Sequence, residues 1–271
     1  MKKLGRIIKG IVLFMIIFGV IIVRMLYMDI LMLQNLEIEA SEHITKKYFK
    51  DTTEITLNQN ILRYNLNEKE QGIEEHPYVR EVIIQRKLPD TLEIKLKERE
   101  EYAIIPYNGN YLFMDRELFL LRKSDSYIVG DLPVLREVQV QSADIGNEII
   151  TDNNDQLRFS LDAYEALSIS DISTDITEYY LVEDQLIVET TEHIDIVLGI
   201  DIDLPYTIVA TQQVYEDLLN RNQRNVSIIS KYKDYIYVEA GTFFEDRRSN
   251  EEEEKKHLEE SEEEEEPTGD N

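Results

Sequence analysis

The stretch HPYVREVIIQRKLPDTLEIKLKERE, residues 76–100, decides how the first part of this chain folds. Its run LEIKLK, residues 92–97, alternates apolar and charged side chains, which predicts a half-buried strand over 92–99. Residues 78–87 are predicted to form a second strand, and Pro89-Asp90 between the two is typical of a turn. The stretch therefore predicts two neighbouring strands joined by a short turn.

The residues before this stretch add a strand and two helices. A short strand is expected over 36–39, and Ser41 is placed to cap a helix that ends at about Phe49. A second helix is expected from Asn67, which forms a variant capping box with Glu70. It must end before Pro77, because the residue before a proline avoids the α conformation. The order strand, helix, helix, strand, strand predicts a helix pair that covers one face of a three-stranded sheet.

The chain starts with a basic segment that is followed by an apolar run. Residues 11–23 carry no charge, and a helix needs about 20 apolar residues to cross a bilayer. Lys9, just before the run, and Arg24, just after it, would place their charges at the two membrane interfaces. We therefore expect a cytoplasmic segment over 1–10 and a transmembrane helix over 11–28. The basic residues of the first segment are Lys2, Lys3, Arg6 and Lys9.

Two other interpretations of the apolar run compete with an anchor. A soluble core helix would show a polar face, which this run lacks. A cleaved signal peptide would need small residues at a cleavage site, but the residues that follow are Arg24-Met25-Leu26-Tyr27. We therefore expect an uncleaved anchor, with the N-terminus in the cytoplasm and the chain after about Tyr27 outside it.

Residues 101–244 are predicted to be rich in strands. Apolar spacing predicts one helix from Asp152, acting as its cap, to about Leu167, and another over about 207–220 after Pro205. These elements predict an α+β fold for this region. The expected strands cover 111–115, 118–122, 176–182, 185–190, 194–198, 227–229 and 235–238.

Residues 245–271 form an acidic tail of low complexity. They include fourteen acidic and four basic residues, a net charge of −10, and such a run cannot bury enough apolar surface to fold. We predict a disordered, solvated tail, with loose binding of cations or basic partner segments as the alternative. The whole chain of 271 residues has a formal net charge of −26, which argues against nucleic acid as a ligand of its main body.

The sequence carries no motif of a catalytic, cofactor-binding or metal-binding site. Its histidines are isolated from one another, and it has no cysteine for a disulfide, a thiol nucleophile or a metal ligand. Asp201 and Asp203 lack the further ligands and the glycine of a calcium loop. No phosphate-binding loop or nucleophile elbow is present. We therefore expect no enzyme activity, no cofactor and no metal; the histidines are His43, His76, His193 and His257.

The stretch over 76–100 resembles the POTRA module of the FtsQ/DivIB division proteins. That module carries the pattern P-x-V-x-x-x-x-V-x-R-x-x-P-x-T-L-x-I-x-V-x-E-R. Weaker matches to the family are YLFMD at 111–115, LPVL at 132–135 and VLG at 197–199. The residues that fall on the pattern are Pro77, Val79, Ile84, Arg86, Pro89, Thr91, Leu92, Ile94, Leu96, Glu98 and Arg99.

The resemblance implies both a fold and a function. It implies a POTRA domain of order β-α-α-β-β over 32–100 and a strand-rich α+β interaction domain over 101–244. It also implies a bitopic scaffold of the bacterial divisome, which stabilises the complex that controls septal peptidoglycan synthesis. Its partners would be single-pass proteins of the FtsB/DivIC and FtsL kind, with the septal transpeptidase as a further candidate. The expected location is the cell membrane at the division septum.

Tyrosines gather in the last strand region of the chain. Ordinary strand composition explains them, since tyrosine favours pleated, half-buried surfaces, and a partner surface is the functional alternative. A strand at a sheet edge can accept the strand of another chain. By the resemblance, the last strand is the partner edge, with Tyr232, Tyr235, Tyr237 and Val238 as the candidate partner-binding residues.

Two further classes of function stay open as alternatives. A signal-anchored extracytoplasmic cell-wall enzyme or factor would need a catalytic triad or a ligand cluster. A transport component with a POTRA domain would need a downstream barrel of many alternating strands, for which the chain is too short.

Overall fold

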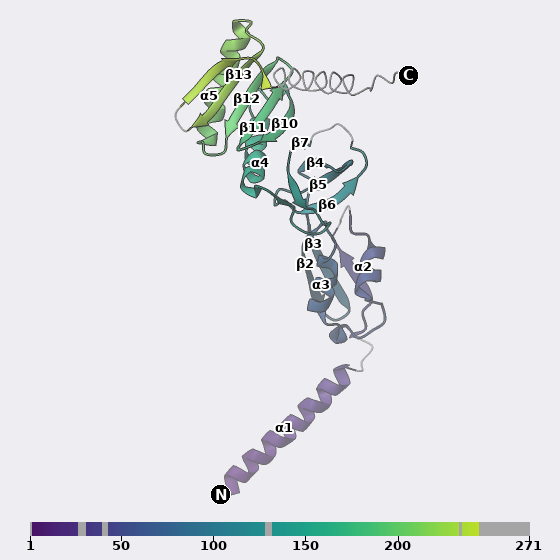
Figure 1. Cartoon of the computed structure of the whole chain (residues 1–271). Coiled ribbons are helices and arrows are strands. Elements are labelled where there is room, and N and C mark those ends of the chain that lie inside the picture. Colours follow the sequence, from purple (N-terminus) through teal and green to yellow (C-terminus); the bar gives the residue numbers. More distant parts are fainter. Residues whose placement is uncertain (1, 27–30, 40–42, 128–131, 233–234, 244–271) are drawn as a thin grey trace, which may run out of the picture. The chain divides into compact units, whose positions relative to one another are not determined.

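A computed structural model describes residues 2–26, 31–39, 43–127, 132–232 and 235–243 of the chain (Figure 1). The chain divides into two compact units, Met1–Glu100 (unit 1) and Glu101–Asn271 (unit 2). Both units combine helices with strands, so the predicted α+β class is confirmed. The predicted disordered tail over 245–271 lies outside the described residues.

Unit 1 begins with one long helix, α1 (Lys2–Leu26). The large apolar side chains over residues 11–18 are all at least half exposed, and the rings of Phe14 and Phe18 stack with their centroids 6.1 Å apart. In the part of the chain that the structure describes, no helix is both long enough and apolar enough to pass through a membrane. The transmembrane helix over 11–28 therefore stays a prediction, and its last two residues lie outside the described ranges.

The remainder of unit 1 contains a three-stranded sheet of order β1-β3-β2. β1 runs parallel to β3, and β2 runs antiparallel to it. The predicted order of strand, helix, helix, strand and strand is confirmed, with a short 3₁₀ helix between the two helices that was not predicted. The elements are β1 (Asn35–Ile38), α2 (Lys46–Thr53), η2 (Ile61–Arg63), α3 (Leu66–Glu74), β2 (Val79–Lys87) and β3 (Thr91–Glu98).

The period-two pattern of β3 builds the core of unit 1. Leu92 and Ile94 are fully buried, while Lys95 between Ile94 and Leu96 is exposed. They pack in one apolar cluster with Phe49 of α2 and Ile73 of α3. One face of the sheet is thus covered by the helices, as predicted.

Both predicted helix starts in unit 1 are wrong. The helix α2 begins at Lys46, where the Thr45 hydroxyl accepts a hydrogen bond from the backbone N–H of Tyr48 at 3.1 Å. The predicted cap Ser41 lies outside the described residues. The helix α3 follows Asn65 as its N-cap, two residues before the predicted cap Asn67.

Glu70 does not close a capping box. Its carboxylate accepts a hydrogen bond at 2.7 Å from the backbone N–H of Ile84 in β2. Since β2 is an edge strand of its sheet, this contact satisfies an amide that would otherwise face outward. A glutamate near a helix start is compatible with either role, and only the tertiary fold decides between them.

A cluster of histidine and tyrosine side chains lies beside the last strand of unit 1. The backbone N–H of Tyr78 donates to Nδ1 of His76 at 3.2 Å. The His43 ring stacks on the Tyr78 ring with a centroid distance of 3.7 Å, and its Nδ1 lies 3.2 Å from Oε2 of Glu98. Burial, and then the neighbouring His43, lower the pKa of His76, although Glu98 opposes this. The ring of Tyr48 contacts His76 edge to face.

We expect unit 1 to lose stability as the pH falls below about 6.5, the ordinary pKa of histidine. Because the pKa of His76 is lowered in the fold, the unfolded chain takes up this proton first, and stability rises with pH through that window. Thermal melts of the full chain at about pH 5 and about pH 7.5 measure the effect. The His76→Asn variant keeps an acceptor for Tyr78 and should show a smaller pH dependence. An undiminished dependence in this variant would contradict the assignment.

Unit 2 is built on a six-stranded sheet of order β14-β13-β12-β11-β10-β7. A three-stranded sheet, β4-β5-β6, is linked to it by a bridge between Ile104 and Val134, next to the start of β7. The strands β8 and β9 form a separate two-stranded antiparallel sheet. The strands are β4 (Ala103–Tyr107), β5 (Asn110–Met114), β6 (Leu120–Ser124), β7 (Leu135–Arg136), β8 (Val140–Ser142), β9 (Ile150–Thr151), β10 (Ile176–Val182), β11 (Gln185–Thr190), β12 (Ile194–Gly199), β13 (Val226–Tyr232) and β14 (Tyr235–Ala240).

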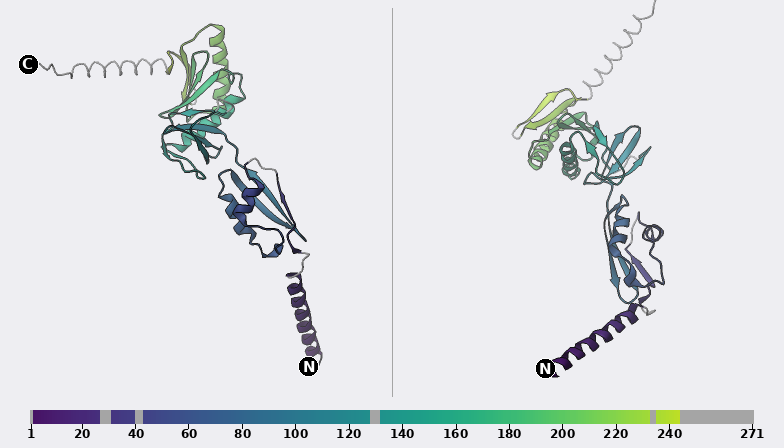
Figure 2. Two further views of the ribbon diagram at one scale, coloured as in Figure 1. Left: turned by 90° about the vertical axis from the view of Figure 1, so that its right-hand side faces the viewer. Right: turned by 60° about the horizontal axis from the view of Figure 1, so that its bottom comes forward.

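Two helices, α4 (Asn154–Ser168) and α5 (Leu204–Asn220), cover one face of the six-stranded sheet (Figure 2, right). Leu161 of α4 and Ile208 of α5 pack in the same buried cluster as Ile196 of β12. The predicted helix starts are again displaced. Asn153 rather than Asp152 caps α4, and Asp203 caps α5, so that Pro205 falls in the first turn of the helix.

Within the residues that the structure describes, the opposite face of the sheet carries no helix, and it has a small apolar cluster of its own. Its centre is formed by Ile187, Val197 and Ile229, which are buried. The strand register places them in one row that runs from Tyr180 of β10 to Tyr237 of β14. We call this side the helix-free face. The predicted strand-rich second module is thus confirmed, with β14 as its last strand.

Candidate partner-binding edge

The strand β14 forms one edge of the six-stranded sheet. It pairs with β13 in antiparallel register, with Tyr237 opposite Ile229 and Val238 opposite Ile228. Over the residues that the structure describes, no strand pairs with the other side of β14. An edge of this kind presents backbone N–H and C=O groups that can pair with another chain.

The register determines which backbone groups of β14 face outward. The N–H of Gly241 donates to the carbonyl of Asn225 at 2.8 Å, at the end of the β13–β14 ladder. Hydrogen-bonded and non-hydrogen-bonded pairs alternate along an antiparallel ladder. It follows that Tyr237 and Glu239 bond to β13, whereas the backbone groups of Val238 and Ala240 point away from the sheet.

The side chains along this edge are apolar and accessible. Tyr235 is 71 % exposed, Tyr237 is 46 % exposed and Val238 is 43 % exposed. The sequence of β14 is YIYVEA, with a single charged residue, although native edge strands are commonly protected by several charges or a proline. The edge therefore combines open backbone groups with apolar area, which is what strand addition by a partner requires.

The structure brings the four candidate residues into one hairpin but divides their side chains between two faces. Tyr237 lies on the helix-free face, since it is opposite Ile229, and Tyr235 follows the same alternation. Val238 lies on the face that the helices cover. Tyr232 pairs with Tyr235 in register, and its side chain lies outside the described atoms. That these residues bind a partner stays a prediction.

Residues that were not predicted hold β14 in place at its end. The carboxylate of Asp195 in β12 is 1 % exposed and accepts a hydrogen bond from the N–H of Phe243 at 2.8 Å. The hydroxyl of Ser227 donates to the carbonyl of Gly241 at 2.9 Å. The one available signal in the sequence is the acidic Asp195 within the otherwise apolar strand IDIVLG.

Gly199 allows β12 and β13 to approach closely near the β13–β14 hairpin. A Cβ atom at this position would lie 2.8 Å from the carbonyl oxygen and 3.0 Å from the Cα of Lys231, which are backbone atoms. We expect Gly199→Ala to move the hairpin and to lower the free energy of unfolding by about 1–3 kcal/mol. Urea unfolding of the full chain measures this. Gly109→Ala, at a turn with no atom within 4 Å of the added Cβ but with a positive φ, gives a comparison for backbone strain alone.

The charged residues of the described ranges do not form a metal centre. No group of three or more histidine, aspartate or glutamate residues there is placed to hold a metal ion. His43 and His76 lie in the ring cluster of unit 1, and His193 adopts a positive φ in the turn before β12. His257 lies outside the described residues.

The sequence of this chain is similar to the sequences of known cell division proteins. Residues 31–99 match the model of the FtsQ-type POTRA domain. The chain is 32 % identical over 123 residues to "Cell division protein DivIB" of Clostridium botulinum strain Loch Maree, an alignment that covers 45 % of each chain. It is 28 % identical over 147 residues to the DivIB of Clostridium acetobutylicum, covering 54 % of this chain and 58 % of the relative.

A relative that is named FtsQ rather than DivIB also matches. The chain is 27 % identical over 113 residues to "Cell division protein FtsQ" of Rickettsia bellii, covering 42 % of this chain and 41 % of the relative. The chain thus spans about half the length of the curated relatives that it matches.

Proposed function

Since residues 31–99 form an FtsQ-type POTRA domain and the chain is a relative of the cell division proteins DivIB and FtsQ, we propose that it is a membrane scaffold of the bacterial divisome. The names of the relatives support a role in cell division. In the proposed role the protein binds other single-pass division proteins and stabilises the complex that controls septal peptidoglycan synthesis. Its mechanism is binding rather than turnover.

The proposed membrane anchor is α1. Its 25 residues would extend for about 38 Å at 1.5 Å per residue, against a hydrocarbon core of about 30 Å. The apolar side chains over residues 11–18 are exposed, and a continuous apolar surface of this kind is unfavourable in water but suits contact with lipid. The basic residues before them favour a cytoplasmic N-terminus. This orientation puts the POTRA domain and unit 2 outside the cytoplasm.

The proposed partner site is the open edge of β14. A partner of the FtsB/DivIC kind would add a strand there, with the outward backbone groups of Val238 and Ala240 supplying hydrogen bonds and Tyr235 and Tyr237 supplying apolar area. An FtsL-type protein, and the septal transpeptidase, would join through the same assembly. Because all these proteins are anchored in one membrane, their effective concentrations near this edge are raised.

The observation that carries this proposal is the FtsQ-type POTRA domain in a chain related to division proteins. The experiment is depletion of the protein together with fluorescent tagging of the full chain. We expect label at midcell and filamentous cells after depletion. Diffuse label with normal division in depleted cells would overturn the proposal.

A further inference from the structure

Three connections of unit 1 meet at the end of the POTRA domain where the chain arrives from α1. They are residues 31–34 before β1, residues 54–65 between α2 and α3, and the turn 88–90 between β2 and β3. We call these three connections the anchor-side end of the domain.

Backbone hydrogen bonds hold the three connections together. The N–H of Leu33 donates to the carbonyl of Gln59 at 2.8 Å, which joins the first connection to the second. The N–H of Gln34 donates to the carbonyl of Asp90 at 2.8 Å, which joins the first to the third. Side chains that project from these segments therefore share one end of the domain.

The anchor-side end exposes three leucines. The side chains of Leu57, Leu62 and Leu88 are 42 %, 40 % and 61 % exposed. In the part of the POTRA domain that the structure describes, the one other exposed large apolar side chain is that of Ile83 in β2. The exposed apolar area of this domain is thus concentrated where the chain comes from α1, and a grouping of this kind marks an interaction surface.

The same end carries few charges for a chain of this composition. Its nineteen residues include three charged ones, Glu54, Arg63 and Asp90, whereas 31 % of the whole chain is charged. Their formal net charge is −1, against −26 for the whole chain. A surface of anionic lipids repels acidic segments, and this end offers little for it to repel.

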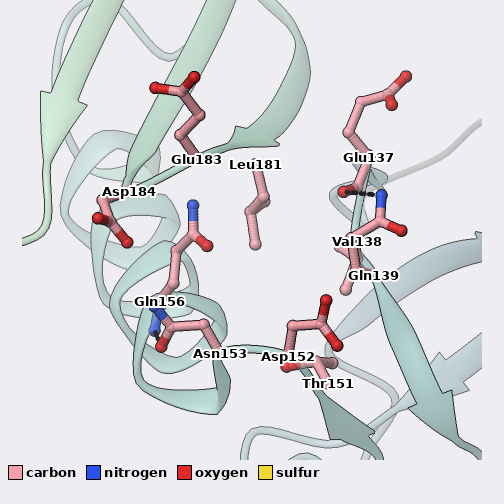
Figure 3. Close-up of a pocket in the computed structure, with 10 residues that line it drawn as sticks. All are labelled: Glu137, Val138, Gln139, Thr151, Asp152, Asn153, Gln156, Leu181, Glu183 and Asp184. Atoms are coloured by element: carbon pink, nitrogen blue, oxygen red, sulfur yellow. Dashed lines mark hydrogen bonds between the residues drawn. The ribbon is translucent and has the colours of Figure 1, made fainter.

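A pocket of unit 2 has the opposite character (Figure 3). Four of the ten residues that line it carry carboxylates. Its polar side chains bond within the protein, since Asp152 accepts from Nε2 of Gln141 at 2.8 Å and Nε2 of Gln156 donates to the carbonyl of Gln185 at 3.0 Å. Such an acidic surface does not suit a membrane, whereas the anchor-side end does.

The chain itself keeps the anchor-side end close to the proposed anchor. Residues 27–30 separate Leu26, the last residue of α1, from Leu31. These five residue steps span at most about 18 Å in any conformation, since an extended chain covers about 3.3–3.6 Å per residue. With α1 across the bilayer, the anchor-side end therefore stays within reach of the outer lipid headgroups.

We propose that the anchor-side end of the POTRA domain rests on the outer surface of the membrane, with Leu57, Leu62 and Leu88 among the lipid headgroups. This contact rests on the proposed role of α1 as the anchor. Apolar side chains are stabilised at the boundary between headgroups and acyl chains. Because α1 tethers the domain, even a weak contact of this kind is well populated. It would hold the POTRA domain in one orientation to the membrane.

The test uses the full chain in nanodiscs of phosphatidylglycerol and phosphatidylethanolamine with a trace of lipid that carries a nitroxide near its headgroup. NMR follows the native methyl groups. We expect the resonances of Leu57, Leu62 and Leu88 to broaden at least about threefold more than that of Ile83. Ile83 is the matched control, because it is 40 % exposed and lies five residues from Leu88 along the chain, or about 16 Å in a strand. Equal broadening of Leu88 and Ile83 would overturn the proposal.

A methyl group of α1 separates this contact from the anchor. In a second sample the nitroxide lies near the end of the acyl chain, where it should broaden the resonance of Leu13 if α1 spans the bilayer. Broadening at Leu13 without broadening at the anchor-side end would refute the surface contact and leave the anchor intact. No broadening at Leu13 would refute the anchor and the surface contact together.

Two double variants locate the contact. Leu62→Gln with Leu88→Gln should reduce the broadening at Leu57 by at least about threefold, since two of the three apolar side chains are lost from the headgroup region. Leu62→Met with Leu88→Met keeps the apolar character and should retain the broadening. Both positions are exposed, so neither change removes packing from the core. The same broadening at Leu57 in the two double variants would contradict the contact.

Discussion

Replacing Val238 by proline is expected to weaken binding of an FtsB/DivIC-type partner by at least about tenfold while unit 2 stays folded. The backbone N–H of Val238 points away from β13, so its removal breaks no bond within the sheet. A proline there removes a donor that an added strand needs, and its ring blocks the approach of that strand. Co-purification of the two full-length proteins from nanodiscs measures the effect.

Two control variants separate strand addition from loss of the fold. Val238→Thr keeps the N–H and a β-branched side chain, and it should retain partner binding. Tyr237→Pro removes an N–H that bonds to β13, and it should destabilise unit 2 by about 1–3 kcal/mol. If Val238→Pro binds the partner as tightly as the unmodified protein, strand addition at this edge is wrong.

Arginine at both Phe14 and Phe18 is expected to release the protein from the membrane. Both residues lie within the uncharged run of α1, and their rings stack on one side of the helix. An arginine near the middle of a spanning helix costs about 2.5–3.5 kcal/mol on insertion scales, so two cost about 5–7 kcal/mol. Fractionation of cell extracts at alkaline pH, followed by detection of the full chain, shows where the protein lies.

The matched control replaces the same two phenylalanines by leucine. This double variant loses the aromatic pair but keeps the apolar character, and it should stay in the membrane fraction. If the arginine variant also stays there, α1 is not the anchor. The anchor prediction then fails without any consequence for the β14 edge, because the two rest on different residues.

The strands were predicted well because their patterns are local. The alternation of Leu92, Ile94 and Leu96 with charged residues requires only that one face be buried, and β3 follows it. The pair β10 and β11 also occupies the predicted residues, since Glu183-Asp184 is a turn signal between two apolar runs. Four strands of unit 2 were not predicted: β4, whose AIIPY run contains a proline, and β7, β8 and β9, which have only two or three residues each.

Helix starts and the details of the partner edge were not predictable in the same way. Asn65 and Asn67 are equally suitable caps by residue type, and the packing of α3 on the sheet selects the first. The hydrogen bond from the Phe243 N–H to the Asp195 carboxylate joins residues 48 positions apart, and the sequence has no local signal for such a contact. The tyrosines of the last strand were identified, but which backbone groups face outward follows only from the register with β13.

The most direct test of strand addition is amide hydrogen exchange at β14, measured residue by residue with and without the partner. The amides of Val238 and Ala240 should exchange quickly in the free protein and slowly in the complex, while those of Tyr237 and Glu239, which bond to β13, should change little. Fast exchange at Val238 and Ala240 with the partner bound would contradict the account.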